Sequence, residues 1–367
     1  YTSNILPTDP PFADLHIIDL APFREEDVND PGAYLAGNLV HPEAGWNGAK
    51  IYRSTTLLQN PPVPYTSGNF DPWKDLIFET PGGYSTTALA DGNMHVMDRK
   101  NTVTVTMNHG TLASLPRYEV NEGGNLAVLG SEVLAFQTAE SLGNGDYTLS
   151  NLLRGLRGTV TTDHGIGERL VMVNSLGFSF FGVGGSGPYW NFKVVPLGAT
   201  ATNVPAISIT QAPAGVVPVS FQQTGQNRRP APTCNLRGVR NAVSDDLALR
   251  WDRTTRSLIR GIASTRPVNE PFLQFGVRFY ADATSTVLLH FSPAFPAAGN
   301  PMSGGQPAGP GGQFGLTISG GLLNMIYTIA NPTAVPGWAP GDPVFIECVQ
   351  VSPNGGPAGR VRERFEF

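Results

Sequence analysis

Short runs rich in Val, Ile, Thr and aromatic residues recur along almost the whole chain, each bounded by Gly, Pro, Asn or Asp. Such runs are typical of β-strands. In the stretch 102–107, TVTVTM, Thr and Val alternate so regularly that one face is expected to be buried and the other wet. The best helix candidate, FREEDV at 23–28, is short and can equally be read as a loop. We therefore predict an all-β protein.

The predicted strands form two groups. Nine precede residue 200: LHIIDLA (15–21), AYLAGNLV (33–40), KIYRSTT (50–56), TVTVTM (102–107), LAVLG (126–130), EVLAFQTAE (132–140), YTLSNLLRG (147–155), RLVMVN (169–174) and WNFKVVPLG (190–198). Seven follow residue 233: CNLRGVRN (234–241), DLALRWD (246–252), FLQFGVRFYA (272–281), TVLLHFS (286–292), NMIYTIA (324–330), PVFIECVQVS (343–352) and RVRERFEF (360–367).

The length of 367 residues favours two domains, because a single core rarely grows beyond about 250 to 300 residues. Residues 201–230 separate the two groups of strands and are poor in charge, with interspersed Pro, Gly and Ala. We predict a β domain over 1–200, an extended linker over 201–230 with the boundary near 226–231, and a second domain over 231–367.

Seven short strands, with Trp251 at the end of the second, favour an immunoglobulin-like or fibronectin type III-like sandwich for the second domain. Its fourth and fifth strands are separated by residues 293–315, a Pro/Gly/Ala-rich insertion far longer than an ordinary hairpin loop. We expect this insertion either to be mobile or to be held by a partner.

Composition excludes several classes of protein. The net charge of −5 and the absence of a basic patch argue against nucleic-acid binding, and no apolar run is long enough for a membrane span. Gly (43 residues) and Pro (32 residues) are abundant, as turns require, while charged residues make up only 14 %. With 40 % hydrophobic residues, the surface has few charges to cover it, so we expect apolar surface to remain for partners.

The sequence contains no complete motif for catalysis or for binding a metal or a cofactor. GVGGSG (182–187) matches a dinucleotide-binding pattern, but a strand follows it where a helix is required, so we interpret it as a tight turn. The six histidines lack metal-ligand spacing, and His109-Gly110 and His164-Gly165 are expected in turns. Glu25, Glu26 and Asp27 are adjacent in sequence, unlike the converging carboxylates of glycosidases. We predict a chain that is not an enzyme and has no metal or cofactor, although histidines distant in sequence could still converge.

The chain has two cysteines, Cys234 and Cys348, too few for a disulfide framework. They fall in separate predicted strands. We favour two buried thiols, with a disulfide between the two strands as the alternative.

Two Arg-Gly pairs stand close together in GDYTLSNLLRGLRGT (145–159). One interpretation is a loop that grips phosphate, but no basic patch surrounds it. In the other, the glycines allow sharp turns and each arginine folds back onto loop carbonyls or a carboxylate, with Glu132, Glu140 and Asp163 as candidates. We favour this structural role for the motif residues Arg154, Gly155, Arg157, Gly158 and Thr159.

The segment EVLAFQTAESLGNGDYTLSNLLRGLRGTVTTDHGIGERLVMVN (132–174) is similar to the tail-tip, or host-specificity, proteins of long-tailed phages and gene transfer agents. The family pattern begins with a hydrophobic strand that starts at a Glu and leads to F-x-x-A. The block Y-x-L-S-x-L-L-R-G-x-R-G-T follows, and after it come H-x-x-G and another hydrophobic strand. Residues 15–55 resemble the start of the same domain, and 229–256 the fibronectin-like segment that follows it. LLRGLRGT is the one sharp motif; the other matches are looser.

The resemblance implies the C-terminal part of a central tail protein at the distal end of the virion tail, outside the cell. It implies a homo-oligomer, typically a trimer in this family, in contact with other tail or baseplate proteins and with a host receptor or glycan, and no nucleic acid. Within it, we expect the strand-like pieces VPAISIT and GVVPVSF of 199–230 to lie along a neighbouring chain.

The alternative function is a secreted adhesin that binds or cleaves carbohydrate, in which loop aromatics stack on sugar rings. The aromatic residues expected in loops, as receptor or partner contacts, are Tyr65, Trp73, Tyr189, Trp190 and Trp338. Each of them could equally anchor a core or an interface.

Overall fold

The structure is a computed structural model, and it divides the chain into two compact units. It describes residues 13–27, 30, 32–39, 48–54, 70–92, 94, 96–175, 177–182, 189–196, 219–222, 225–226, 234–240, 247–252, 274–280, 288–291, 307–308, 312–319, 322–329, 343–352, 356–357 and 361–366. One unit comprises Tyr1–Leu20 with Pro31–Gly225, and the other Ala21–Asp30 with Gln226–Phe367.

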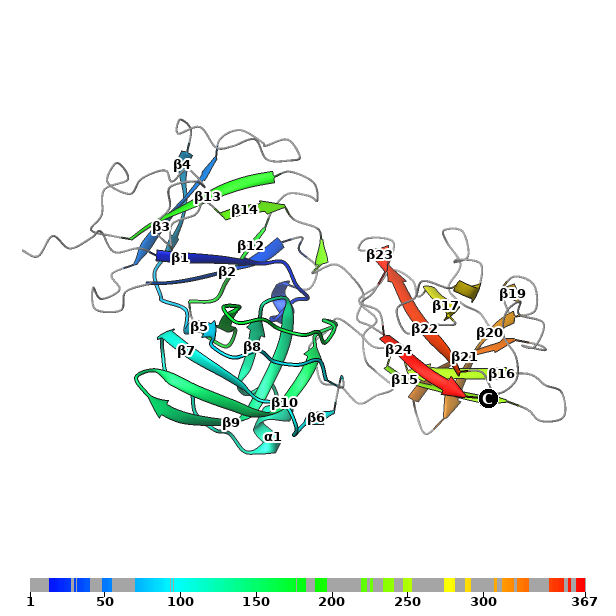
Figure 1. The fold of residues 1–367 in the computed structure, drawn as a ribbon. Helices are drawn as coiled ribbons and strands as arrows, with labels where there is room; N and C mark the ends of the chain where they lie inside the picture. Colours follow the sequence, from blue (N-terminus) through cyan, green and yellow to red (C-terminus); the bar gives the residue numbers. More distant parts are fainter. Residues whose placement is uncertain are drawn as a thin grey trace, which may run out of the picture. The chain divides into compact units, whose positions relative to one another are not determined.

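The described residues are mostly in β-strands, as the alternating sequence pattern predicts (Figure 1). Each run predicted as a strand coincides with or overlaps a strand of the structure. The helix candidate FREEDV is a single 3-10 turn, η1 (Glu25–Asp27), and the other described helix is α1 (Arg117–Asn121). No described helix is long and apolar enough to span a membrane.

The first unit contains a two-sheet sandwich. One sheet has the order β1 (Ala13–Ile18), β2 (Gly32–Leu39), β12 (Ser179–Gly182). The other has the order β14 (Val219–Gln222), β13 (Tyr189–Pro196), β3 (Ala49–Ser54), β4 (Phe70–Leu76). Alternate residues of both sheets share one core, composed of Leu15, Ile17, Ala33, Leu35, Ala49, Ile51, Leu76, Phe181, Phe192, Val194 and Phe221. All the strand pairs in these sheets are antiparallel.

The same unit contains a closed barrel of six antiparallel strands. They are β5 (Gly82–Ser85), β7 (Val103–His109), β8 (Leu126–Leu129), β9 (Glu132–Gly143), β10 (Asp146–Leu156) and β11 (Arg169–Met172). Their order is β10-β7-β5-β11-β8-β9, and β9 pairs back with β10 to close the ring. The short β6 (Met97–Asp98) adds to β10 next to the stretch that pairs with β7.

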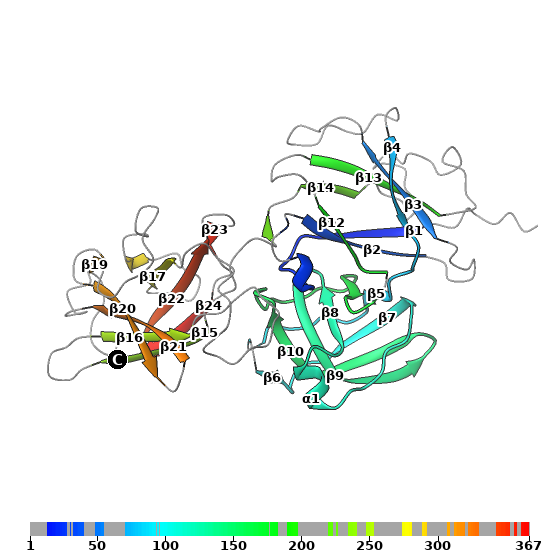
Figure 2. The ribbon, with the colours of Figure 1, turned by 180° about the vertical axis from the view of Figure 1, so that it is seen from behind.

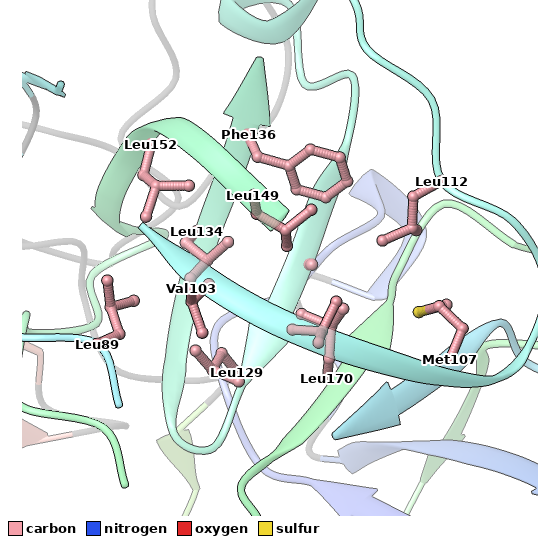
Figure 3. Close-up of a cluster of buried hydrophobic side chains, with 12 residues drawn as sticks. Leu89, Val103, Met107, Leu112, Leu129, Leu134, Phe136, Leu149, Leu152 and Leu170 are labelled. Atoms are coloured by element: carbon pink, nitrogen blue, oxygen red, sulfur yellow. The ribbon is translucent and has the colours of Figure 1, made fainter. Parts of the chain in front are cut away.

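Apolar side chains from five of the six strands of the ring, all except the glycine-rich β5, fill the barrel (Figure 3). In β7 the buried residues Val103, Val105 and Met107 alternate with more exposed Thr and Asn, as TVTVTM predicts. Phe136 and Leu134 of β9 and Leu149 of β10 are fully buried among them. In both views α1 lies beside β9 (Figures 1 and 2). The barrel therefore has its own hydrophobic core, separate from that of the sandwich.

The barrel is inserted into the sandwich sequence, between β4, which ends at Leu76, and β12, which begins at Ser179. Polar contacts join the two bodies. Arg169 of β11 forms an ion pair with Asp14 of β1 at 2.5 Å and donates a hydrogen bond to the Leu15 carbonyl. Thr80 exchanges two hydrogen bonds with Gly37. The region predicted as one β domain over 1–200 thus holds two cores.

The predicted linker over 201–230 contributes one strand to the first unit. Val219–Gln222, from the piece GVVPVSF, forms β14 and pairs with β13 of its own chain. Part of this piece therefore pairs within its own chain, where β14 is the edge strand of its sheet. Phe221 is the reason, because its side chain joins the sandwich core. The piece VPAISIT lies outside the described residues.

The second unit contains two five-stranded sheets, with ten strands in its described residues where seven were predicted. One has the order β15 (Cys234–Arg240), β16 (Leu247–Asp252), β21 (Leu322–Ile329), β20 (Gly312–Ser319), β19 (Pro307–Ala308). The other has the order β18 (Leu288–Phe291), β17 (Gln274–Tyr280), β22 (Pro343–Ser352), β23 (Gly356–Pro357), and β24 (Val361–Glu366) also pairs with β22.

The insertion predicted over 293–315 is partly strand. Its end contains β19 and the start of β20, and β20 forms a tight hairpin with β21 in which Ser319 pairs with Leu322. The sequence GQFGLTIS did not suggest this because its glycines resemble those of a loop. The preceding residues, 293–306, lie outside the described residues.

Candidate functional site

The arginine-glycine motif ends β10 and forms the turn that follows it. Register along the β9–β10 pair shifts between Leu153 and Leu156, and backbone dihedral φ is positive at Gly155 (63°), Arg157 (55°) and Gly158 (80°). Positive φ is readily adopted by glycine and is costly for most other residues. The two glycines therefore allow the chain to turn sharply where the strand leaves the barrel.

Arg154 forms a buried two-point ion pair with Glu132 at the start of β9. Its Nε–H donates to Glu132 Oε1 at 2.6 Å, and Nη2 donates to Glu132 Oε2 at 2.8 Å. Both residues are 0 % exposed. A planar guanidinium matches a carboxylate in this arrangement, which is stronger and more directional than a single ionic contact.

The remaining donors of Arg154 bind the loops around the barrel end. Nη1 donates to the Ala90 carbonyl at 2.9 Å, and Nη2 donates to the Thr162 carbonyl at 3.0 Å. Nη1 also lies 3.8 Å from Asp98 Oδ2 of β6. One side chain thus ties together three segments far apart in sequence. Because the guanidinium is buried and its donors are occupied, Arg154 offers no surface for a phosphate group.

His164 extends this network from the opposite side of Glu132. Its Nε2 lies 2.9 Å from Glu132 Oε2, and its Nδ1 lies 2.6 Å from Glu168 Oε2. Both ring nitrogens face carboxylate oxygens, and only the doubly protonated imidazolium can donate to both. His164 is 2 % exposed and its backbone pairs with Leu89. The prediction that His164 stands in a turn is wrong, because the charge network holds it inside the barrel end.

Gly155 and Thr159 complete the motif. The Gly155 N–H donates to Glu132 Oε1 at 2.9 Å, so this carboxylate accepts bonds from backbone and side chains alike. A Cβ at Gly155 would lie only 2.9 Å from Met94 Cγ. The Thr159 hydroxyl donates to the Leu156 carbonyl at 2.7 Å and accepts the Val133 N–H at 2.9 Å, which fixes the turn against β9.

The network shifts the pKa values of its own members. Burial by itself would raise the pKa of Glu132, but hydrogen bonds from His164 and Arg154 outweigh it and hold this pKa below its ordinary value. Burial would lower the pKa of His164, but its bonds to Glu132 and Glu168 raise it instead. The pKa of Glu168 is lowered, because the bonds from His164 and Gly165 outweigh burial. Each shift favours the charged form, so these three groups support one another as ions.

This arrangement is suited to stabilising the conformation of the barrel end. Glu132, Arg154 and His164 are all buried, and Glu132 binds both of the other side chains inside the protein. Glu132 was among the candidate partners of the arginines, whereas Glu140 is exposed and Asp163 accepts the Asp91 N–H. Loop carbonyls were also expected as partners, and those of Ala90 and Thr162 accept bonds from Arg154. Sequence reasoning missed Glu168 and Asp98. Among the described residues, no group of three or more His, Cys, Asp or Glu side chains is arranged to hold a metal ion.

Three of the aromatic candidates for receptor contact lie in described strands of the sandwich. Trp73 lies in β4 and Trp190 in β13, and both rings pack against the sandwich core. Their expected position in loops is wrong. Trp190 shares the core face of β13 with Phe192, and a register shift in the β3–β4 pair allows Trp73 to face the core together with Leu76. Tyr189 also lies in β13, and Tyr65 and Trp338 lie outside the described residues.

The structure also locates residues of three other sequence predictions. His109, at the end of β7, forms an ion pair with Glu79 at 3.0 Å, and Gly110 follows with a positive φ of 85°. Cys348 is a buried thiol in β22, while Cys234 lies in β15. Gly182 of the GVGGSG stretch ends β12, and its other residues lie outside the described part of the chain.

Comparison with protein families gives one match, which coincides with the barrel. Residues 81–171 match the family model described as Rcc01698-like, C-terminal. Rcc01698 is a gene transfer agent protein of Rhodobacter. The matched range begins one residue before β5 and ends within β11, so it spans the closed ring and the whole charge network. No curated protein matched the sequence.

Proposed function

We propose that this chain is a structural component of the distal tail tip or baseplate of a gene transfer agent or long-tailed phage, involved in recognising and attaching to the host surface. One observation carries the proposal: the family match and the closed barrel cover the same residues. The LLRGLRGT motif, which carries the sequence resemblance, lies inside this barrel with Arg154 bound to Glu132. The resemblance supplies the tail-tip location.

In this proposal the second unit is an immunoglobulin-like or fibronectin type III-like module. Its strand order supports this assignment. When eight of its strands are lettered in chain order, with β18 as an extra C′ strand, β15-β16-β21-β20 corresponds to the sheet A-B-E-D, and β17-β22-β24 to the sheet C-F-G. Small modules of this kind commonly present loops to a partner at the ends of the sandwich.

The proposed role is non-enzymatic and needs no metal, cofactor or nucleic acid. The buried charge network supports it, because the most conspicuous titratable groups are used to hold the barrel end together. The proposed assembly state is a homotrimer packed against other tail proteins. Light scattering should give a molar mass of three chains at micromolar concentration, and a folded monomer would contradict the trimer.

Location in the particle can be tested directly. An antibody raised against the barrel, residues 81–173, should label one end of the tail in electron micrographs of purified particles from the source organism. The same antibody applied to particles from a strain lacking this gene is the control. Recovery of the protein only in the particle-free supernatant, with no label on tails, would refute the proposed function.

A further inference from the structure

Arg53 lies between two tryptophan rings at one end of the sandwich core. Its Cζ atom is 4.1 Å from the ring centroid of Trp190 and 5.4 Å from that of Trp73. Arg53 follows the buried Ile51 by two residues in β3, so both side chains point to the same face of the sheet. The stacking of a guanidinium on tryptophan is favourable and fixes the plane of the arginine fork.

The N–H groups of the Arg53 guanidinium have no hydrogen-bond partner within the described part of the chain. Arg53 has no hydrogen bond or ion pair there, although a guanidinium carries five N–H donors. Next to it, the indole N–H of Trp190 is buried and also lacks an acceptor. A buried donor without an acceptor is rare in native proteins and indicates a missing partner. Both of these groups are donors, so a partner that binds them must supply acceptors.

The geometry selects the kind of acceptor. The Arg53 guanidinium lies over both tryptophan rings, and its N–H groups match two oxygens of a carboxylate or phosphate. We propose that Arg53, held between Trp73 and Trp190, binds an oxyanion at the end of the sandwich core, either the carboxylate of an acidic sugar or a phosphate group. The Trp190 indole N–H supplies an additional donor.

Two charged neighbours bear on this site. Asp71 of β4 is the cross-strand partner of Arg53, but the two side chains do not form an ion pair. Asp71 is exposed, and its charge repels an incoming anion. Asp71→Asn is therefore expected to tighten binding. Lys50 of the same strand forms an ion pair with Asp75 at 3.3 Å and supplies a matched control for the loss of one positive charge.

The test follows the indole N–H resonances of the five tryptophans in the full-length chain, with Trp190→Phe used to assign the signal of Trp190. Glucuronate and inorganic phosphate are added in parallel titrations at constant ionic strength, with glucose as the neutral control. At least one oxyanion is expected to move the Trp190 signal in a saturable way, and glucose is not. Arg53→Met should weaken that binding about tenfold or more, because a charged hydrogen-bond donor is lost. Lys50→Gln should leave it unchanged.

The outcomes separate the ligand sources. A response to glucuronate alone assigns an acidic saccharide, a response to phosphate alone assigns a phosphate group, and both support the site. No saturable response to either anion, or an equal response in Arg53→Met, overturns it. If Arg53→Met does not fold, the Arg53 Nε–H resonance of the unmodified chain decides, since a bound oxyanion must shift it. Labelling of tails does not depend on this result, so failure here leaves the proposed function standing.

Discussion

Arg154 shows how one residue can organise a large part of a fold. Its guanidinium joins Glu132 of β9 to the carbonyls of Ala90 and Thr162, all without exposure to solvent. Burying these charges is costly, and their mutual hydrogen bonds compensate only while every partner is present. The network is therefore sensitive to the removal of any single member.

Replacing Arg154 is expected to destabilise the barrel strongly. Arg154→Met keeps much of the side-chain volume but leaves Glu132 buried without its main counter-ion, which should lower the free energy of unfolding by about 3 to 5 kcal/mol. Urea unfolding followed by circular dichroism measures this. Arg117→Gln, at an exposed position on α1, is the control and should change stability by less than about 0.5 kcal/mol. A similar small effect for both variants would show that the pair is energetically neutral.

The charge network also predicts how stability depends on pH. The pKa of His164 is raised above its ordinary value of 6.5, so its contribution is complete below that pH and is lost as pH rises through the folded pKa. The pKa values of Glu132 and Glu168 are lowered from 4.5, so their contribution is complete above 4.5 and is lost on acidification through the folded values. The network should therefore be strongest between about pH 4.5 and 6.5.

Urea unfolding at pH 5.5 and pH 9 tests the histidine. The unmodified chain should lose stability at the higher pH, and His164→Gln should lose less because it has no proton to release. Comparison of the two proteins cancels other titrating groups, including His16, whose pKa burial lowers to about 4. Equal losses in both proteins would assign the pH dependence to another group.

At the scale of elements, the turn after β10 depends on its glycines. Gly155→Ala places a Cβ 2.9 Å from Met94 Cγ and forces a side chain into a positive φ of 63°. Left-handed backbone alone costs about 1 to 2 kcal/mol. Gly143→Ala is the matched control, since φ there is also positive at 91° but no atom lies within 4 Å. Gly155→Ala should lower the melting temperature more than Gly143→Ala, and the reverse order would show that Met94 adapts without cost.

Strands were predictable from sequence because their alternation is local, as in Val103–His109, where every second side chain is buried. Two strands were missed for other reasons. Gly82–Ser85 is short and half glycine, whereas Gly312–Ser319 alternates at Phe314, Leu316 and Ile318 but begins in the Gly-rich stretch that was read as a loop. Ring closure was not predictable, since it depends on β9 pairing with both β8 and β10.

The candidate site was predictable in part. The Glu that begins the family pattern is Glu132, and the His of its H-x-x-G is His164. In the structure, Glu132 Oε2 lies 2.9 Å from His164 Nε2. Both residues are in the pattern, but a linear sequence does not indicate that two residues 32 positions apart form a hydrogen bond. The loop positions expected for Trp73 and Trp190 were wrong for a related reason: both residues lie near turn-rich sequence, yet their rings face the core.

At the scale of the molecule, the barrel is a candidate for independent folding. Its core contains residues from Leu89 to Leu170 only, and its ring closes without any strand of the sandwich. A fragment of residues 81–174 is expected to give a β-type circular dichroism spectrum and a cooperative thermal transition. Phe136→Ala in the fragment should abolish that transition, because it removes a fully buried ring worth about 3 to 5 kcal/mol. A disordered fragment would show that the Asp14–Arg169 contact with the sandwich is required.

Because the barrel is inserted between β4 and β12, the two parts of the sandwich are synthesised on the ribosome at different times. Strands β1 to β4 emerge first, but their core partners Phe181, Phe192 and Phe221 follow only after the whole barrel has been translated. At about 5 to 20 residues per second, the roughly one hundred intervening residues take about 5 to 20 s. By the end of that interval the barrel has all its strands, while the half-built sandwich still exposes Leu15, Leu35 and Ile51. The nascent chain is thus most vulnerable to aggregation and most dependent on chaperones in its N-terminal segment, until residue 222 has left the exit tunnel.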